Sequence, residues 1–275
     1  MQRIHAVRAV LSENLAYRDL LINLVLRDLK VRYQRSVLGF AWSMLNPLFM
    51  VLVFTIVFTV LRPQDVPNYP LFVLCGLLPW NLLATSVSGA ARSIVGNAHL
   101  IDKVYFPREL LPLSVVLANL INFALSLIVF AGMAFLYGVP VTWWMLAFPF
   151  VVAIQLVFIC GLALFVAALN VFYRDTELFL DVGLLAWFFL TPIFYQLELL
   201  PNKLTIFGQT LGIDVWRLVY MLNPMATLVT DYRYILLYNY GLIRHTLVAG
   251  LAALLCLGVG WYVFRRASPH FAEAV

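Results

Sequence analysis

Charged residues are scarce in this chain. Only 11% of its 275 residues are Asp, Glu, Lys or Arg, whereas a soluble domain usually carries about 25%. Hydrophobic residues make up 64%, more apolar surface than a water-soluble fold of this size can bury. The composition therefore excludes an ordinary soluble protein and predicts an all-α integral membrane protein, since long apolar runs are typical of spanning helices.

Lysine is rarer still, because Lys30, Lys103 and Lys203 are the whole set. None of them follows a glycine, so the G-x-x-x-x-G-K-[ST] loop that cradles nucleotide phosphates is missing. The chain is not a P-loop ATPase by itself. If ATP drives its function, a separate partner must hold the nucleotide and Mg²⁺, and we expect no cofactor in this chain.

Groups for metal binding, redox chemistry and ion relay are also lacking. Cys75, Cys160 and Cys256 each stand alone in an apolar run, and the four histidines are scattered, so we expect no metal site. The central thirds of the apolar runs contain no ionisable residue, which argues against an ion-coupled carrier. Acids and bases outside the runs show no spacing that indicates catalysis, so we expect no catalytic residues.

What the chain has in abundance is apolar runs. Six are long enough to cross a bilayer, which takes about 20 residues: residues 38–61, 71–95, 110–137, 145–170, 177–196 and 242–264. They predict a transmembrane domain over 38–264 between an N-terminal region, 1–37, and a tail, 265–275. Pro47 and Pro192 fall inside predicted spans and are expected to kink them. Small residues over 86–91 favour close helix packing.

The few positive charges orient the predicted bundle. With six spans the two termini share a side, and that side carries 13 of the 18 Lys and Arg residues. The positive-inside rule then places both termini of this predicted multi-pass protein in the cytoplasm.

Two regions do not fit a plain six-span bundle. Residues 15–36 predict an amphipathic helix with a polar stripe and an apolar stripe (Asp19, Asn23, Arg27, Lys30, Gln34 and Leu15, Ile22, Leu26, Leu29, Tyr33). It is expected to lie in the membrane surface, or else to pack on the bundle. Residues 197–241 are external yet apolar, and Asn223–Pro224 splits their later part into two pieces too short to span. We expect short re-entrant helices there, with a folded external loop as the alternative.

Three motifs together resemble the membrane subunits of type-2 ABC exporters, and more narrowly the polysaccharide-export permeases for O-antigen and teichoic acid. They are RDLKVRYQRSVLGFAWSMLNPL (27–48), KVYFPRELLPLS (103–114) and LNVFYRDTE (169–177). The resemblance covers nearly the whole chain in order. It implies a homodimer bound to two copies of a separate ABC ATPase, which agrees with the missing P-loop.

The resemblance also implies where the ATPase docks. In such exporters the loop between the second and third spans, here residues 97–109, couples the two proteins. The matching positions are Asp102, Lys103, Tyr105, Phe106, Pro107, Arg108 and Glu109, with Arg174 and Asp175 of the next loop as a second contact. We expect Tyr105 and Phe106 to be exposed together as anchors, since aromatic anchors dominate many interfaces. A plain turn is the alternative.

A path for the cargo follows from the same resemblance. The first and fifth spans would line a glycan channel with Trp42, Phe49, Trp187, Phe188 and Tyr195, although tryptophans also gather at membrane interfaces. Arg27, Lys30, Arg32 and Arg35 of the amphipathic gate helix would meet a polyprenyl-linked pyrophosphate, although anionic lipid attraction explains the same charges. We expect an exporter of lipid-linked polysaccharide, with a small-lipid or drug permease and an ion-coupled flippase as alternatives.

Overall fold

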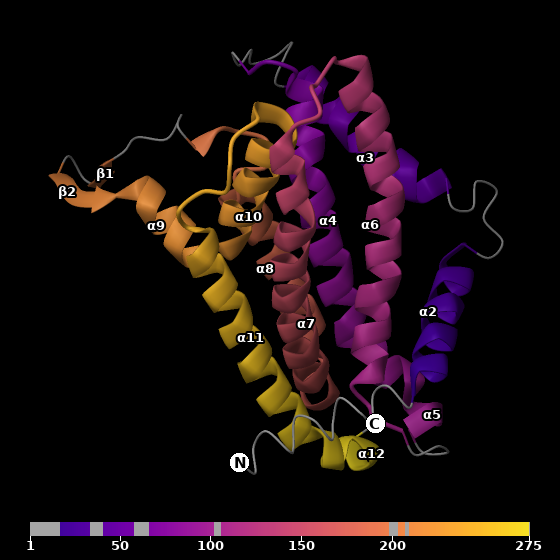
Figure 1. Cartoon of the computed structure of the whole chain (residues 1–275). Coiled ribbons are helices and arrows are strands. Elements are labelled where there is room, and N and C mark those ends of the chain that lie inside the picture. The colour runs from indigo at the N-terminus through magenta and orange to yellow at the C-terminus, as the bar shows by residue number, and fades with distance from the viewer. Residues whose placement is uncertain are drawn as a thin grey trace.

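Helices make up most of the computed structural model, which describes residues 17–33, 41–57, 66–101, 106–197, 203–206 and 209–274 (Figure 1). Strands β1 and β2 form a single antiparallel hairpin. The elements in chain order are α2 (Arg18–Tyr33), α3 (Ala41–Thr55), α4 (Tyr69–Ser93), η2 (Val95–Asn97), α5 (Ala98–Ile101), α6 (Leu110–Leu136), η3 (Trp143–Ala147), α7 (Phe148–Phe172), α8 (Thr176–Leu190), β1 (Lys203–Ile206), β2 (Gln209–Asp214), α9 (Val215–Leu222), α10 (Pro224–Arg233), the π-helix η5 (Tyr234–Tyr238), α11 (Thr246–Ala267), η6 (Ser268–His270) and α12 (Phe271–Ala274).

Four helices within the described ranges are long and apolar enough to cross a membrane: α4, α6, η3 with α7, and α11 with η6. They correspond to the second, third, fourth and sixth predicted spans, and their ends agree within a few residues. Helices α3 and α8 lie at the first and fifth predicted positions. Each is 15 residues long, or about 22 Å at 1.5 Å per residue.

The end of α8 departs from the prediction that Pro192 lies inside a span. The helix stops at Leu190, and Thr191 is extended with ψ 133°. A proline disfavours helical backbone in the residue before it, so Pro192 ends this helix early instead of kinking it. The Thr191 hydroxyl donates to the Trp187 carbonyl at 2.8 Å and closes the last turn. Pro47, by contrast, lies within α3 as expected.

Helix α4 is the centre of the bundle, with α3, α6, α7, α8 and α10 packed around it. The small residues over 86–91 lie on its close contact with α6, because a Cβ on Gly89 would come within 2.7 Å of Val115 Cγ1. Ser86, Ala90 and Ala91 are fully buried. Small side chains let two backbones approach, which favours helix association in lipid.

The closest helix crossing joins α7 to α11. A Cβ on Gly260 would lie 2.0 Å from the Gly161 carbonyl oxygen, and a Cβ on Gly161 would lie 2.5 Å from the Cys256 carbonyl carbon. Backbone therefore meets backbone at this point. Any side chain on either glycine would push the two helices apart.

The region from 197 to 241 folds into short elements. Helix α9 has 8 residues and α10 has 10, and they meet at the predicted break, Asn223–Pro224. The Asn223 side chain caps α10 by accepting from the Ala226 N–H at 3.2 Å. Hairpin β1–β2 precedes them, which differs from the predicted all-α fold. Apart from half-buried Pro224, helix α10 is buried along its length against α4, α7 and α11.

Helix α2 packs on α6 instead of standing free (Figure 1). Leu24, Val25 and Leu29 are buried there, whereas Ile22 and Leu26 of the predicted apolar stripe are 42% and 52% exposed. The helix thus has two apolar faces. One binds the bundle and the other remains open to the surroundings.

Candidate functional site

One end of the bundle gathers the start of α6, the last turns of α11 and the residues that follow it. This end, drawn at the bottom of Figure 1, is called the lower end, and the opposite one the upper end. An apolar cluster holds it together, with Phe106, Leu110, Leu111, Phe264 and Phe271 all buried. The rings of Phe264 and Phe271 meet edge to face at 5.3 Å. The C-terminal turn is therefore part of the core.

Polar contacts tie the loop before α6 to the same C-terminal turn. The Arg108 guanidinium donates to the Ser268 carbonyl, and the Glu109 carboxylate pairs with Arg265 at 3.5 Å. Glu109 is buried while Arg265 remains nearly half exposed. A groove of about 450 Å³, lined also by Tyr17, Pro107 and Pro269, opens between these segments.

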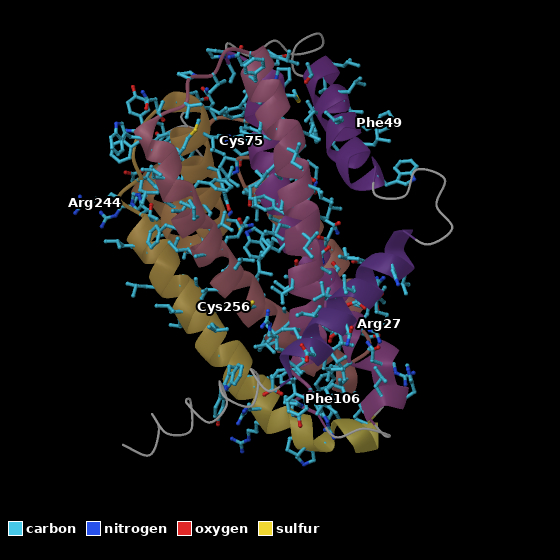
Figure 2. All side chains as sticks on the ribbon, turned by 45° about the vertical axis from the view of Figure 1, so that its right-hand side comes forward. Arg27, Phe49, Cys75, Phe106, Arg244 and Cys256 are labelled. Atoms are coloured by element: carbon cyan, nitrogen blue, oxygen red, sulfur yellow. The ribbon has the colours of Figure 1, made fainter. Side chains whose placement is uncertain are left out.

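The predicted coupling residues divide into two groups. Asp102, Lys103 and Tyr105 lie outside the described residues. Phe106 is only 8% exposed and lies in the cluster of the lower end (Figure 2). The expectation that its ring is exposed is wrong, because the ring is buried in this apolar cluster. Pro107, Arg108 and Glu109 line the groove.

The second predicted contact loop joins α7 to α8. Arg174 and Asp175 are both exposed there, as a contact surface requires. Next to them, Glu177 in the first turn of α8 forms an ion pair with Arg92 in the last turn of α4. The end of α4 and the start of α8 are thus linked by an ion pair.

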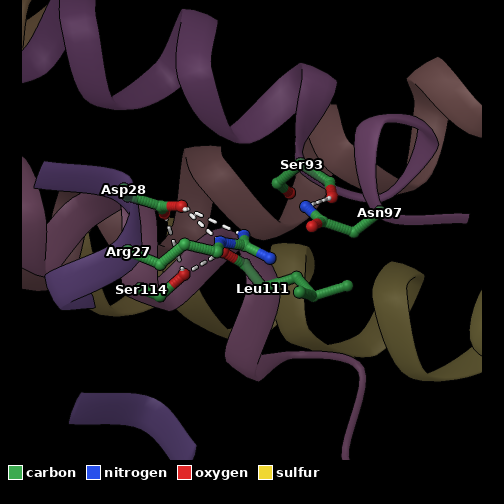
Figure 3. A network of polar contacts seen from close by, with 6 residues as sticks. All are labelled: Arg27, Asp28, Ser93, Asn97, Leu111 and Ser114. Carbon is green, nitrogen blue, oxygen red and sulfur yellow. Dashed lines mark hydrogen bonds and ion pairs between the residues drawn. The ribbon is translucent and has the colours of Figure 1, made fainter. Parts of the chain in front are cut away.

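Helix α2 joins the lower end through a small polar network (Figure 3). Arg27 pairs with Asp28 at 3.0 Å, and the Ser114 hydroxyl lies 3.4 Å from the other Asp28 oxygen. Ser114 also donates to the Leu111 carbonyl at 2.8 Å in the first turn of α6. Lys30 is exposed. The Arg32 side chain and Arg35 lie outside the described residues.

Aromatic rings crowd the contact between α8 and its neighbours. Trp187 meets Trp80 and Phe158 edge to face, with centroids 5.9 and 6.0 Å apart, and its indole N–H donates to Asn223 Oδ1 at 2.9 Å. Phe188 contacts Trp80 at 5.6 Å. The Tyr195 hydroxyl donates to the Phe189 carbonyl at 3.3 Å. Trp187 and Phe188 are thus half-buried inside one chain.

The predicted channel residues of α3 lie elsewhere. Trp42 and Phe49 are 49% and 56% exposed, and Phe49 points away from the bundle in Figure 2. No ring contact joins either of them to Trp187 among the described side chains. Phe54, near the end of α3, does reach the α8 group, at 6.3 Å from Phe188.

The buried helix α10 carries two charged residues to the upper end. Asp231 accepts from the Ile243 N–H at 2.9 Å and from the Thr246 hydroxyl at 2.7 Å, at the start of α11. Arg233 donates to the carbonyls of Pro192, at 2.5 Å, and Ile193, which follow α8. An anion thus sits at a helix N-terminus and a cation just beyond a helix C-terminus, the signs that the helix dipole favours.

Comparison with known proteins places this geometry in a family. Residues 19–237, from α2 to the π-helix η5, match the family described as ABC-2 type transporter. The chain belongs to the ABC-2 type transporter family. It is 40% identical over 261 residues to the O-antigen export system permease protein RfbA of Myxococcus xanthus, which covers 94% of this chain and 96% of that protein. Two proteins of the same name from Klebsiella pneumoniae are each 32% identical, with the same coverage.

Several contacts of this ABC-2 transporter are absent from the sequence predictions. Arg265, Ser268 and Phe271 hold the predicted coupling loop, and they lie about 160 residues from it in the chain. Asn223 was predicted only as a break, yet its amide joins α8 to α10. No spacing in the sequence indicates such long-range contacts. The Phe and Arg residues at the end of the last predicted span, Phe264 to Arg266, were the one hint in the sequence that this segment makes such contacts.

Proposed function

We propose that this chain is the membrane subunit of an ATP-driven exporter that moves a lipid-linked O-antigen polysaccharide across the cytoplasmic membrane. The observation that carries the proposal is its similarity, over 94% of its length, to proteins named O-antigen export system permeases. A small-lipid or drug cargo has no comparable support. The central thirds of the apolar runs contain no Asp, Glu, Lys, Arg or His to relay an ion, which argues against an ion-coupled flippase.

In this proposal six helices span the bacterial inner membrane, and the lower end lies on its cytoplasmic side. Arg108, Arg265 and Arg266 all belong to the lower end, and the positive-inside rule favours that orientation. Helices α3 and α8 would be the first and fifth spans. They are the shortest of the six, and α9 with α10 would re-enter the membrane above α8, because neither helix is long enough to span alone.

The groove at the lower end would receive one copy of a partner ATPase, so that a homodimer carries two. Pro107 and Arg108 line it, and Arg174 with Asp175 would supply the second contact. Phe106 and Glu109 would act indirectly, by fixing the loop on α11 and its C-terminal turn. A movement of the ATPase would thereby reach α6 and α11 together.

The exposed faces of α3 and α8 would meet their counterparts in a second copy and enclose the path of the glycan. Trp42 and Phe49 lie on one face, and Phe179, Val182 and Phe189 on the other, all with about half or more of their area open. Aromatic faces suit the apolar C–H faces of sugar rings. Trp187, Phe188 and Tyr195 would support this wall from behind.

Helix α2 would guide the substrate's pyrophosphate at the cytoplasmic entrance. Lys30 is exposed and Arg27 is partly so, and both suit phosphate. Because Arg27 already pairs with Asp28, a phosphate would have to compete for it. The exposed apolar face of α2, with Ile22 and Leu26, would contact lipid.

Deletion of the gene tests the proposed function. Cells without this chain should lose O-antigen from their surface and retain lipid-linked glycan inside, and the wild-type gene should restore export. A normal O-antigen ladder on gels of the deletion strain would refute the proposal. A normal ladder with altered sensitivity to lipophilic drugs would favour a small cargo instead.

Co-purification with the ATPase tests the docking surface separately. We expect Arg108→Ala to reduce the amount of ATPase recovered with the tagged chain, because Arg108 lines the groove and orders its loop. Arg244→Ala is the matched control, since Arg244 is exposed and lies before α11, away from the lower end (Figure 2). Equal recovery with both variants would contradict docking at this groove.

A further inference from the structure

A small pocket lies at the upper end, beside the buried helix α10. Its volume is about 220 Å³ and it opens to the surface. Four tyrosines line it: Tyr220 from α9, Tyr234 and Tyr238 from the π-helix η5, and Tyr240 just after it. The predicted channel residues do not include any of them, and the pocket is separate from the groove at the lower end.

The π-helix explains why three of the rings gather here. Its wide turn runs over Tyr234–Tyr238 and ends at Asn239 in the left-handed region, with φ 57°. The chain then folds back, so that the Tyr240 N–H donates to the Tyr234 carbonyl at 2.9 Å. The Tyr234 ring lies 6.2 Å from Tyr238 and 5.8 Å from Tyr240. Single π-turns are uncommon and occur often at functional sites.

The base of the pocket is rigid. The Arg233 guanidinium lies 3.5 Å from the centroid of the Phe72 ring, and it donates to two carbonyls of the segment after α8. Gly76 leaves the space for it, because a Cβ there would come within 2.9 Å of Arg233 Nη2. The Arg233 side chain at the base is thus held by its own contacts, and holding part of a site in place lowers the entropic cost of binding.

Gln196 supplies a polar group at the same pocket. Its side chain is half-buried and lines the cavity. Within the described part of the chain, no residue forms a hydrogen bond with its amide. An amide offers two donors and one acceptor, so the Gln196 side chain could bond to a polar ligand in the pocket.

We propose that this pocket binds one sugar residue of a glycan. Tyrosine rings match the apolar C–H faces of a sugar, and the Gln196 amide matches its hydroxyl groups. The volume of 220 Å³ lies below the roughly 300–1,000 Å³ of sites for drug-sized ligands. A single ring therefore suits it, and the rest of the chain would leave through the open side.

This inference rests on the proposed function for its biological meaning, since a glycan would meet the pocket as it leaves the upper end. The binding itself needs neither export nor an ATPase. It is tested on the full chain, purified in detergent, by saturation-transfer NMR. The probes are the methyl glycosides of glucose, galactose, mannose, rhamnose and N-acetylglucosamine, with glycerol 3-phosphate as a lipid-headgroup mimic.

We expect saturation transfer to at least one glycoside. Tyr240→Ala and Gln196→Ala should each weaken its binding by about 2- to 10-fold, the equivalent of one aromatic or one hydrogen-bonded contact. Tyr137→Ala is the control, because Tyr137 is also an exposed tyrosine, at the end of α6 and outside the pocket. Thermal unfolding of each variant checks that it is folded.

Three outcomes would overturn the inference: no transfer to any glycoside, an equal loss in Tyr137→Ala, or transfer to glycerol 3-phosphate alone. The last would assign the pocket to a lipid headgroup. Failure of the export test with glycoside binding intact would remove the proposed function and leave the pocket standing. Export of O-antigen without glycoside binding would remove the pocket alone.

Discussion

A single methyl group at the α7–α11 crossing should destabilise the whole chain. In Gly260→Ala the new Cβ would lie 2.0 Å from the Gly161 carbonyl oxygen, although real Cβ atoms essentially never approach another heavy atom within 3.0 Å. The two helices would have to separate by about 1 Å or more. The obstacle is backbone, so no rotamer change relieves it.

The size of the effect follows from overpacking, which costs about 1–3 kcal/mol. Alanine also favours the helix over glycine by up to about 1 kcal/mol, so we expect a net loss of about 2 kcal/mol. That corresponds to a fall of roughly 4–8 °C in the midpoint of unfolding. Gly161→Ala should act likewise, because its Cβ would meet Cys256 and Leu257 backbone at 2.5 Å.

Thermal unfolding in detergent, followed by tryptophan fluorescence, measures the loss. Gly258→Ala is the matched control, since it lies two residues away on α11 and its Cβ would have nothing within 4 Å. It should unfold at the wild-type temperature or slightly above. The double variant at 161 and 260 should lose less than the sum, because one separation relieves both clashes. Equal midpoints for Gly260→Ala and Gly258→Ala would refute the packing argument.

Two further predictions concern polar contacts. Arg265→Ala should cost about 1–2 kcal/mol, because Arg265 itself is nearly half exposed but its removal leaves the buried Glu109 carboxylate without this partner, and it should reduce ATPase recovery; full recovery would contradict its bracing role. Asn223→Ala should cost about 1–3 kcal/mol, because α10 loses its N-cap and the Trp187 indole N–H loses its acceptor. The unfolding midpoint should fall and the tryptophan emission should change. Unchanged emission would count against the hydrogen bond between Trp187 and Asn223.

Local patterns in the sequence were enough to predict the long helices. The apolar runs match α4, α6, α7 and α11, and the Asn223–Pro224 break falls between α9 and α10, because hydropathy and proline act over a few residues. The predicted effect of Pro192 was wrong. We expected a kink within a span, whereas Pro192 disfavours helical backbone at Thr191 and thereby ends the helix.

Contacts between distant segments were beyond such patterns. Asp231 and Arg233 lie in the region predicted to be external, yet both residues are buried because α10 fits between other helices and its neighbours supply carbonyls and N–H groups. Phe106 was predicted to be an exposed anchor and is buried in the apolar cluster of the lower end. Whether a polar or aromatic side chain faces solvent depends on segments far away in the chain, which composition does not reveal.

The glycine crossing also divides α11 unequally. Gly260 lies seven residues before the end of the helix at Ala267 and fourteen after its start at Thr246, or about 10 Å and 21 Å along the axis. If α11 swings as a rigid rod about this point, a displacement of Ala267 is roughly doubled at Thr246, where Asp231 is bonded. Because the pivot lies nearer one end of the helix, a small displacement at one face of the membrane would become a larger displacement at the other.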